Sequence, residues 1–197
     1  MVTIGENIKS SIKFGITTSV SKPLRWLILT ILTIIPIVNF FAAGIYLKVF
    51  RGEEISFDNI GKCFVQGLLA VIIGIIYMII PIIINAVLSG LGIVGTIIGI
   101  IVALIFALFA VPAIVLFARS GNFGAAFKFA DIKAIINQFG FGKYIAAVLI
   151  ELILVAIIGA IIGVLYTFIT PVGIILGIVV CVPMALFVVK YFQGVFA

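Results

Sequence analysis

Residues 63–118 read CFVQGLLAVIIGIIYMIIPIIINAVLSGLGIVGTIIGIIVALIFALFAVPAIVLFA, and none of these side chains is charged. A helix rises about 1.5 Å per residue, so about 20 residues cross a hydrocarbon core about 30 Å thick. The stretch is long enough for two such helices, and Ser89-Gly90-Leu91-Gly92 near its middle supplies turn-forming residues. We predict a transmembrane helical hairpin over residues 63–118.

The rest of the 197-residue chain has a similar composition. Hydrophobic residues make up 65% of the sequence and charged residues 9%, against about a quarter charged in soluble proteins. A second apolar stretch, interrupted only by Glu151, is divided at Thr170-Pro171-Val172-Gly173 and predicts another hairpin over residues 144–193. We therefore expect an all-α integral membrane protein, folded as a single membrane domain over residues 1–197.

Residues 24–49 form a shorter apolar stretch that is interrupted in its middle. Pro36 removes a backbone donor, Asn39 offers a side chain to the freed backbone groups, and Gly44 follows. Positive residues flank the stretch on both sides, which fits a single crossing poorly because such residues are retained in the cytoplasm. We expect a broken helix that enters the membrane and returns, as a re-entrant segment or helical hairpin. The alternative is one kinked span with the N-terminus outside.

The lysines and arginines, twelve in all, indicate how the hairpins are oriented. Neither hairpin turn contains one, and positive residues in short loops are retained on the cytoplasmic side. We expect a multi-pass protein of the plasma membrane whose charged segments face the cytoplasm.

The N-terminal segment, residues 1–22, has the pattern of a helix lying in the membrane interface. Thr3 and Glu6 have the spacing of a capping box, and Ile4, Ile8 and Ile12 then recur on one face. An apolar face beside lysines is typical of interfacial amphipathic helices.

Residues 119–143 predict a second interfacial helix, capped by Asp131 and ended by Gly140. Its apolar side chains are Ile132, Ile135, Ile136 and Phe139. The basic side chains that could meet anionic lipid headgroups are Arg119, Lys128, Lys133 and Lys143. Plain retention of positive residues in the cytoplasm explains the same lysines equally well.

Glu151 is the one charge inside an otherwise apolar run. It lies as far before Thr170 as Lys190 lies after Pro171, so the two side chains are expected at the same depth. An unpaired carboxylate in a membrane costs several kcal/mol, and we therefore expect an ion pair between Glu151 and Lys190. The alternatives are a protonated or tyrosine-bonded Glu151, and a role in transport.

Small and polar residues form faces on the predicted spans. Gln66, Tyr77 and Asn85 share one face of a helix, which could line a polar crevice. Small residues recur every fourth position on the other helices: Gly95, Gly99, Ala103 and Ala107; Gly159, Gly163 and Thr167; Gly173, Gly177, Cys181 and Ala185. Such faces allow helix backbones to approach closely in lipid, and helix packing is the simpler explanation for all of them.

The sequence contains few residues that could support catalysis. The chain has no histidine, and six acidic residues and two cysteines leave few candidates for a base or a metal ligand. We expect no enzymatic activity, no catalytic, cofactor or metal site, and no nucleic-acid partner.

Two segments resemble a known family: PIVNFFAAGIYLKVFRGEE at residues 36–54 and ARSGNFGAAF at residues 118–127, with Asp58, Gly67, Tyr77 and Pro81 between them. They are similar to the domain of unknown function 4013 family, which consists of polytopic membrane proteins of archaea and bacteria. The resemblance covers about residues 5–193. It implies a membrane topology and carries no activity over to particular residues.

Three functions from different classes follow as hypotheses. A membrane scaffold or complex subunit that self-associates through the small-residue faces needs no chemistry and fits most simply. A transporter or channel would use the broken first segment and Glu151. A lipid-binding or lipid-processing protein would use the amphipathic segments. The expected partners are membrane lipids and either further copies of the chain or other subunits.

Overall fold

The computed structural model describes residues 3–35 and 37–196, and all regular secondary structure in these ranges is helical. The expected all-α class is therefore confirmed. The elements are α1 (Ile4–Ser21), α2 (Pro23–Ile34), α3 (Asn39–Phe50), α4 (Ile60–Leu88), the short 3₁₀ helix η1 (Ser89–Leu91), α5 (Gly92–Ser120), the 3₁₀ helix η2 (Phe123–Phe127), α6 (Phe129–Phe139), α7 (Phe141–Phe168) and α8 (Thr170–Val195).

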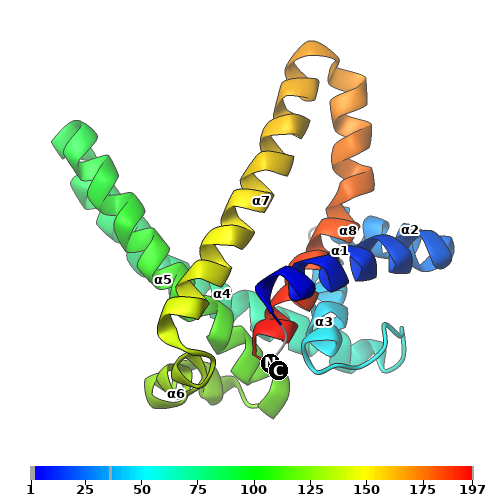
Figure 1. Cartoon of the computed structure of the whole chain (residues 1–197), viewed down its shortest axis with the longest axis horizontal. Coiled ribbons are helices and arrows are strands. Elements are labelled where there is room, and N and C mark those ends of the chain that lie inside the picture. The colour runs from blue at the N-terminus through cyan, green and yellow to red at the C-terminus, as the bar shows by residue number, and fades with distance from the viewer. Residues whose placement is uncertain (1–2, 36, 197) are drawn as a thin grey trace.

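Two long helical hairpins dominate the molecule. α4 and α5 reverse direction at η1, and α7 and α8 reverse at Ile169. Within the described part of the chain, three helical stretches are long and apolar enough to cross a membrane: Ile60–Ser120, which holds the whole first hairpin, Phe141–Phe168 and Thr170–Val195. Figure 1 shows that the hairpins start from a common base and separate toward their tips.

The first apolar segment is a helical hairpin of its own. α2 and α3 have 12 residues each, so each is about 18 Å long, shorter than a hydrocarbon core of about 30 Å. They fold back on each other: the Thr33 and Tyr46 hydroxyl oxygens lie 3.4 Å apart, and Arg25 Nη1 donates to the Ile55 carbonyl at 2.9 Å. The segment is therefore folded as a helical hairpin, and whether it crosses or re-enters the membrane stays a prediction.

The break between α2 and α3 differs in detail from the expectation. Pro36 lies outside the described residues. Asn39 begins α3, and its backbone N–H donates to the Ile35 carbonyl at 2.8 Å, whereas its exposed side chain forms no hydrogen bond with a described residue. The Asn39 side chain therefore does not satisfy a freed backbone group among the described residues, and it is the Asn39 backbone that bonds across the break.

Gly44 belongs to a helix crossing and not to the break. It lies in the middle of α3, where a Cβ atom would collide with the Cys63 carbonyl of α4. A Cβ atom on Gly67 of α4 would in turn collide with the Phe40 carbonyl of α3. The two glycines allow the backbones of α3 and α4 to touch, which fixes the short hairpin to the long one.

α1 packs along α8 through a face of small and polar residues. Its capping box is formed, since Glu6 N–H donates to the Thr3 hydroxyl and the Glu6 carboxylate accepts from the Thr3 backbone. Asn7 Nδ2 donates to the Tyr191 carbonyl at 2.9 Å, and a Cβ atom on Gly15 would lie 2.6 Å from the Pro183 carbonyl. The side chains of Ile12, Ile16 and Val20 lie about 100° around α1 from this face, remain exposed and are available to lipid.

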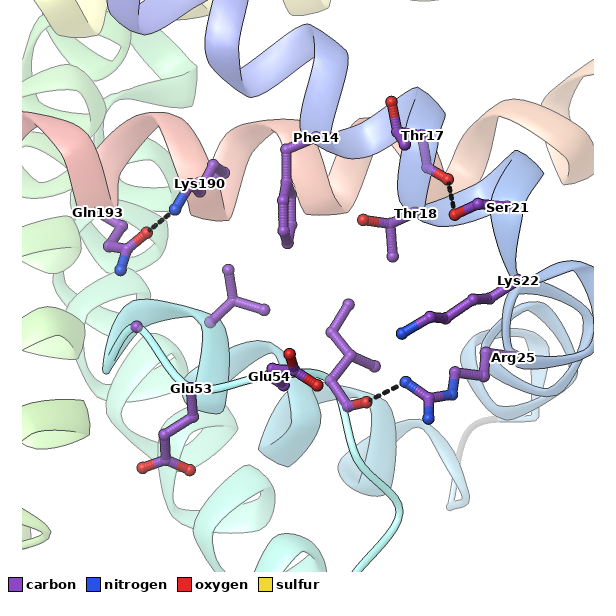
Figure 2. Close-up of a pocket in the computed structure, with 13 residues that line it drawn as sticks. Phe14, Thr17, Thr18, Ser21, Lys22, Arg25, Glu53, Glu54, Lys190 and Gln193 are labelled. Carbon is purple, nitrogen blue, oxygen red and sulfur yellow. Dashed lines mark hydrogen bonds between the residues drawn. The ribbon is translucent and has the colours of Figure 1, made fainter.

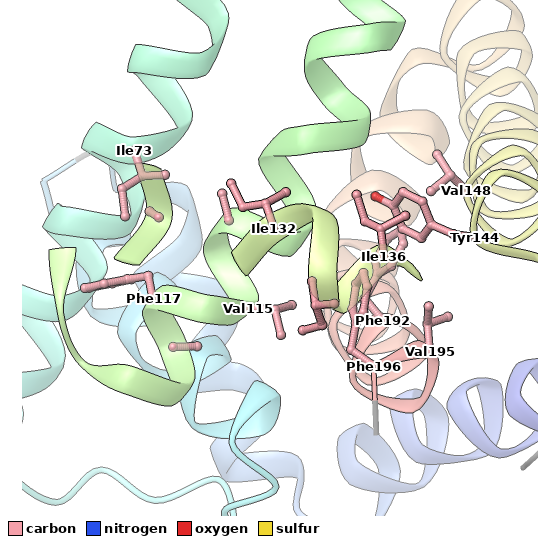
Figure 3. Close-up of a cluster of buried hydrophobic side chains, with 14 of the residues drawn as sticks. Ile73, Val115, Phe117, Ile132, Ile136, Tyr144, Val148, Phe192, Val195 and Phe196 are labelled. Carbon is pink, nitrogen blue, oxygen red and sulfur yellow. The ribbon is translucent and has the colours of Figure 1, made fainter. Parts of the chain in front are cut away.

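The base of the molecule is a conventional apolar core. It joins the ends of α5 and α8, the start of α7, and α6 (Figure 3). Its members include Val115, Phe117, Ile132, Ile136, Tyr144, Phe192 and Phe196. The isoleucines of α6 are thus buried against protein, and they do not face lipid as an interfacial helix would require. Asp131 lies in the first turn of α6 without capping it, because the helix begins earlier, at Phe129.

Candidate functional site

A pocket lined by charged and hydroxyl side chains lies between α1, α2, α8 and the loop that follows α3 (Figure 2). Its volume is about 280 Å³. We call it the charged pocket. Its polar lining includes Thr18, Ser21, Lys22, Arg25, Glu54 and Lys190. The sequence did not single it out, because these residues come from three separate segments of the chain.

Positive charge prevails in the charged pocket. Arg25 is fixed by its bond to Ile55, and Lys190 Nζ donates to Gln193 Oε1 at 2.6 Å and lies 5.3 Å from the centre of the Phe14 ring. The Lys22 ammonium forms no hydrogen bond or ion pair with a described residue. Of the two carboxylates, Glu53 is paired with Arg51, which lies outside the pocket.

A second cavity of about 420 Å³ lies on the other side of the same loop. There the Lys48 ammonium is buried and donates to the Ser56 carbonyl at 3.0 Å, the Ser56 hydroxyl at 2.9 Å and the Asp58 carbonyl at 3.2 Å. Arg51 Nη1 donates to Gln66 Oε1 at 3.3 Å. Lys48 and Arg51 therefore already bond other groups of the chain. Their role is to hold the loop between α3 and α4 in place.

The four residues expected to meet lipid headgroups fall into two groups. Arg119 lines the second cavity and donates to the Phe196 carbonyl, which ties the end of α5 to the end of α8. Lys128, Lys133 and Lys143 are exposed around α6 and the first turn of α7. Arg119 therefore has a structural partner, and a headgroup role for the three lysines stays a prediction.

The predicted polar face of α4 is divided among three partners. Gln66 bonds Arg51, the Tyr77 hydroxyl donates to the Ala126 carbonyl of η2 at 2.7 Å, and Asn85 Nδ2 donates to the Pro81 and Gly99 carbonyls at 3.0 and 3.4 Å. Each side chain holds α4 to a neighbouring element. These contacts correspond to helix packing, the simpler of the two interpretations of this face.

The expected ion pair between Glu151 and Lys190 is not formed. Glu151 is 9% exposed on α7, and the ion pair among the described residues joins Arg51 to Glu53. The depth of residue 190 relative to α7, which was predicted by counting residues from the α7–α8 turn, is nearly right. The neighbouring Tyr191 hydroxyl donates to the Ala147 carbonyl of α7 at 3.0 Å, one helical turn from Glu151. Tyr191 therefore faces α7, and Lys190, one residue earlier and about 100° around the helix, points into the charged pocket instead.

The small-residue faces of α5 and α7 differ in what packs against them. A Cβ atom on Gly95 would collide with the Leu88 carbonyl, and one on Gly99 with the Asn85 side chain, so the glycines of α5 pack inside their own hairpin. Gly159 and Gly163 of α7 have nothing within 4 Å of a Cβ position.

In residues 3–35 and 37–196, no group of three or more histidine, cysteine or acidic side chains gathers to hold a metal ion. The chemistry that the polar side chains offer is hydrogen bonding and charge pairing at the charged pocket.

Comparison with known proteins gives one family match. The model of a family described as a protein of unknown function matches residues 28–170, which is more than half of the chain. This range runs from α2 to the end of the α7–α8 turn. No curated protein and no solved structure matches the chain.

Proposed function

This chain belongs to the DUF4013 family of proteins of unknown function, and from that premise we propose that it is a non-enzymatic membrane scaffold or complex subunit that self-associates through α7. In this proposal the plasma membrane holds the two long hairpins, and the base, with its charged segments, faces the cytoplasm.

The observation that carries the proposal is an open small-residue face on α7. Ala156, Gly159, Ala160, Gly163 and Thr167 are all exposed, and we call them the α7 seam. In lipid, apolar surface alone does not drive helices to associate. Small residues favour association because they let the helix backbones approach closely. The glycines of α5 and the α3–α4 crossing are covered within the chain, whereas a Cβ atom on Gly159 or Gly163 of the α7 seam would meet no described atom within 4 Å.

The open shape of the molecule supports the same proposal. Its accessible surface is 10923 Å², whereas a compact protein of 21.1 kDa exposes about 9,000 Å². The additional area lies along the separated hairpins, where Ile93 and Phe168 near the tips are 80% and 82% exposed. A second copy on the α7 seam would cover part of this surface.

The test replaces the glycines of the α7 seam with a larger apolar residue. The double variant Gly159→Leu, Gly163→Leu fills the close-approach face, and we expect it to be monomeric where the unmodified chain is oligomeric. The control is Ile157→Phe, Ile161→Phe, which adds bulk at the same depth on another exposed face of α7 and should keep the oligomer. Native mass spectrometry in detergent gives the masses.

Energy transfer between labelled copies in vesicles repeats the comparison in a bilayer. An unmodified chain that is monomeric in both media, or a seam variant that stays oligomeric, would refute self-association through α7.

A further inference from the structure

We propose that the charged pocket binds the phosphate group of a membrane lipid, with Lys22 and Arg25 as its principal ligands and Lys190 as a third cation. This site is separate from the α7 seam and does not depend on self-association.

The first reason is unmatched charge. Lys22, Arg25 and Lys190 line the pocket together with two carboxylates, Glu53 and Glu54. Glu53 is paired with Arg51, so Glu54 is the carboxylate left to offset the three cations. The pocket therefore has a net positive charge. Three cations from two separate parts of the chain repel one another, and a bound anion removes that repulsion.

The second reason is the arrangement of donors. One guanidinium nitrogen of Arg25 is fixed on the Ile55 carbonyl at 2.9 Å, which orients the group and leaves its other N–H donors available. Figure 2 shows the Lys22 side chain extending into the same space, with the Thr18 hydroxyl above it. A tetrahedral phosphate accepts several such donors at once, and these charge-assisted hydrogen bonds are strong.

The third reason is the position of the pocket beside lipid-facing surface. Val20 and Leu24, on either side of Lys22 in the chain, are 72% and 71% exposed, and Leu27 is also exposed on α2. These side chains do not line the pocket itself, but Val20 and Leu24 lie within two residues of Lys22, where α1 meets α2. A phosphate at Lys22 would therefore lie next to surface suited to acyl chains, which is the arrangement of a headgroup at the membrane interface.

The experiment measures lipid retention by the full chain in detergent, using native mass spectrometry and phosphatidylglycerol as the probe. We expect Lys22→Gln to weaken binding about tenfold, since it removes a charge-assisted contact. Glu54→Gln should strengthen binding, because it removes the carboxylate that opposes the phosphate. The matched control is Lys13→Gln, an exposed lysine of α1 that does not line the pocket.

Each outcome decides the proposal. If Lys22→Gln and Lys13→Gln weaken lipid binding equally, the lipid is attracted diffusely to basic residues and the proposed site is overturned. No effect of Lys22→Gln, or weaker binding by Glu54→Gln, would overturn it as well. Soluble glycerol phosphate tests the source: if it displaces the lipid at equal concentration, the pocket is a site for free phosphate esters and the lipid assignment fails. The Lys22 ammonium has no hydrogen-bond or ion-pair partner among the described residues. Unchanged thermal unfolding of Lys22→Gln checks that the variant folds normally.

Discussion

The Tyr144 hydroxyl of α7 donates a 2.7 Å hydrogen bond to the Leu108 carbonyl of α5, the carbonyl that Pro112 releases from its own helix. Proline has no N–H and displaces the carbonyl four residues before it, so this acceptor needs an external donor. The bond joins the two long hairpins where they meet at the base. Tyr77 and Tyr191 make similar bonds to the Ala126 and Ala147 carbonyls, so three tyrosines connect the helices of the base.

Replacing Tyr144 with phenylalanine should lower the free energy of unfolding by about 1 kcal/mol, because the Leu108 carbonyl loses its donor. In a Pro112→Ala background the helix can supply its own N–H at this position, and Tyr144→Phe should then cost less. A double-mutant cycle from denaturant titrations in mixed micelles measures this coupling. Equal costs in the two backgrounds would show that the tyrosine does not serve the carbonyl released by proline.

Gly44→Ala should destabilise the protein by about 1–3 kcal/mol, because its methyl group would collide with the Cys63 carbonyl and push α3 away from α4. The matched control is Gly74→Ala in α4, where a Cβ atom meets nothing within 4 Å and alanine is the better helix former. The same unfolding measurement compares them. A harmless Gly44→Ala would mean that the α3–α4 crossing is wider than described.

Glu151→Gln and Lys190→Met should have additive effects on the free energy of unfolding, within about 0.5 kcal/mol, because the two side chains have different surroundings. The measurement is a double-mutant cycle. Coupling well above that margin would restore the ion pair that their positions in the sequence suggested. Lys190→Met should also weaken lipid binding at the charged pocket, whereas Glu151→Gln should leave it unchanged.

The pKa of the Glu6 carboxyl is lowered from 4.5 by hydrogen bonds from the Thr3 backbone N–H and the Thr3 hydroxyl. A lowered pKa in the folded chain means that this cap stabilises α1 above the unfolded-state pKa and is lost as pH falls through the folded value. Thr3→Val should therefore move the Glu6 midpoint upward toward 4.5 in a carbon-detected NMR titration. Thr17→Val, an exposed threonine in the same helix, is the control and should not move it.

The tips of both hairpins should lie on the side opposite the base. Single cysteines at Ser89 and Thr170, in a chain whose natural Cys63 and Cys181 are replaced by alanine, should react with an impermeant maleimide added outside intact cells. A cysteine at Lys133 should react only after the membrane is opened. Labelling of Lys133→Cys from outside would reverse the proposed orientation.

The uncharged residues 63–118 were enough to predict the first hairpin, because the number of apolar residues sets the length of a helix and the glycines at 90 and 92 set its turn. Likewise, the capping box at Thr3 and the break between α2 and α3 are local features that neighbouring residues determine. Tertiary structure decided which face each helix presents. Lys190 and Tyr191 are adjacent in sequence, yet one lines the charged pocket and the other bonds α7. Spacing along the chain gives depth along a helix axis, but rotation about that axis is set by the helices packed against it, and these come from distant parts of the sequence.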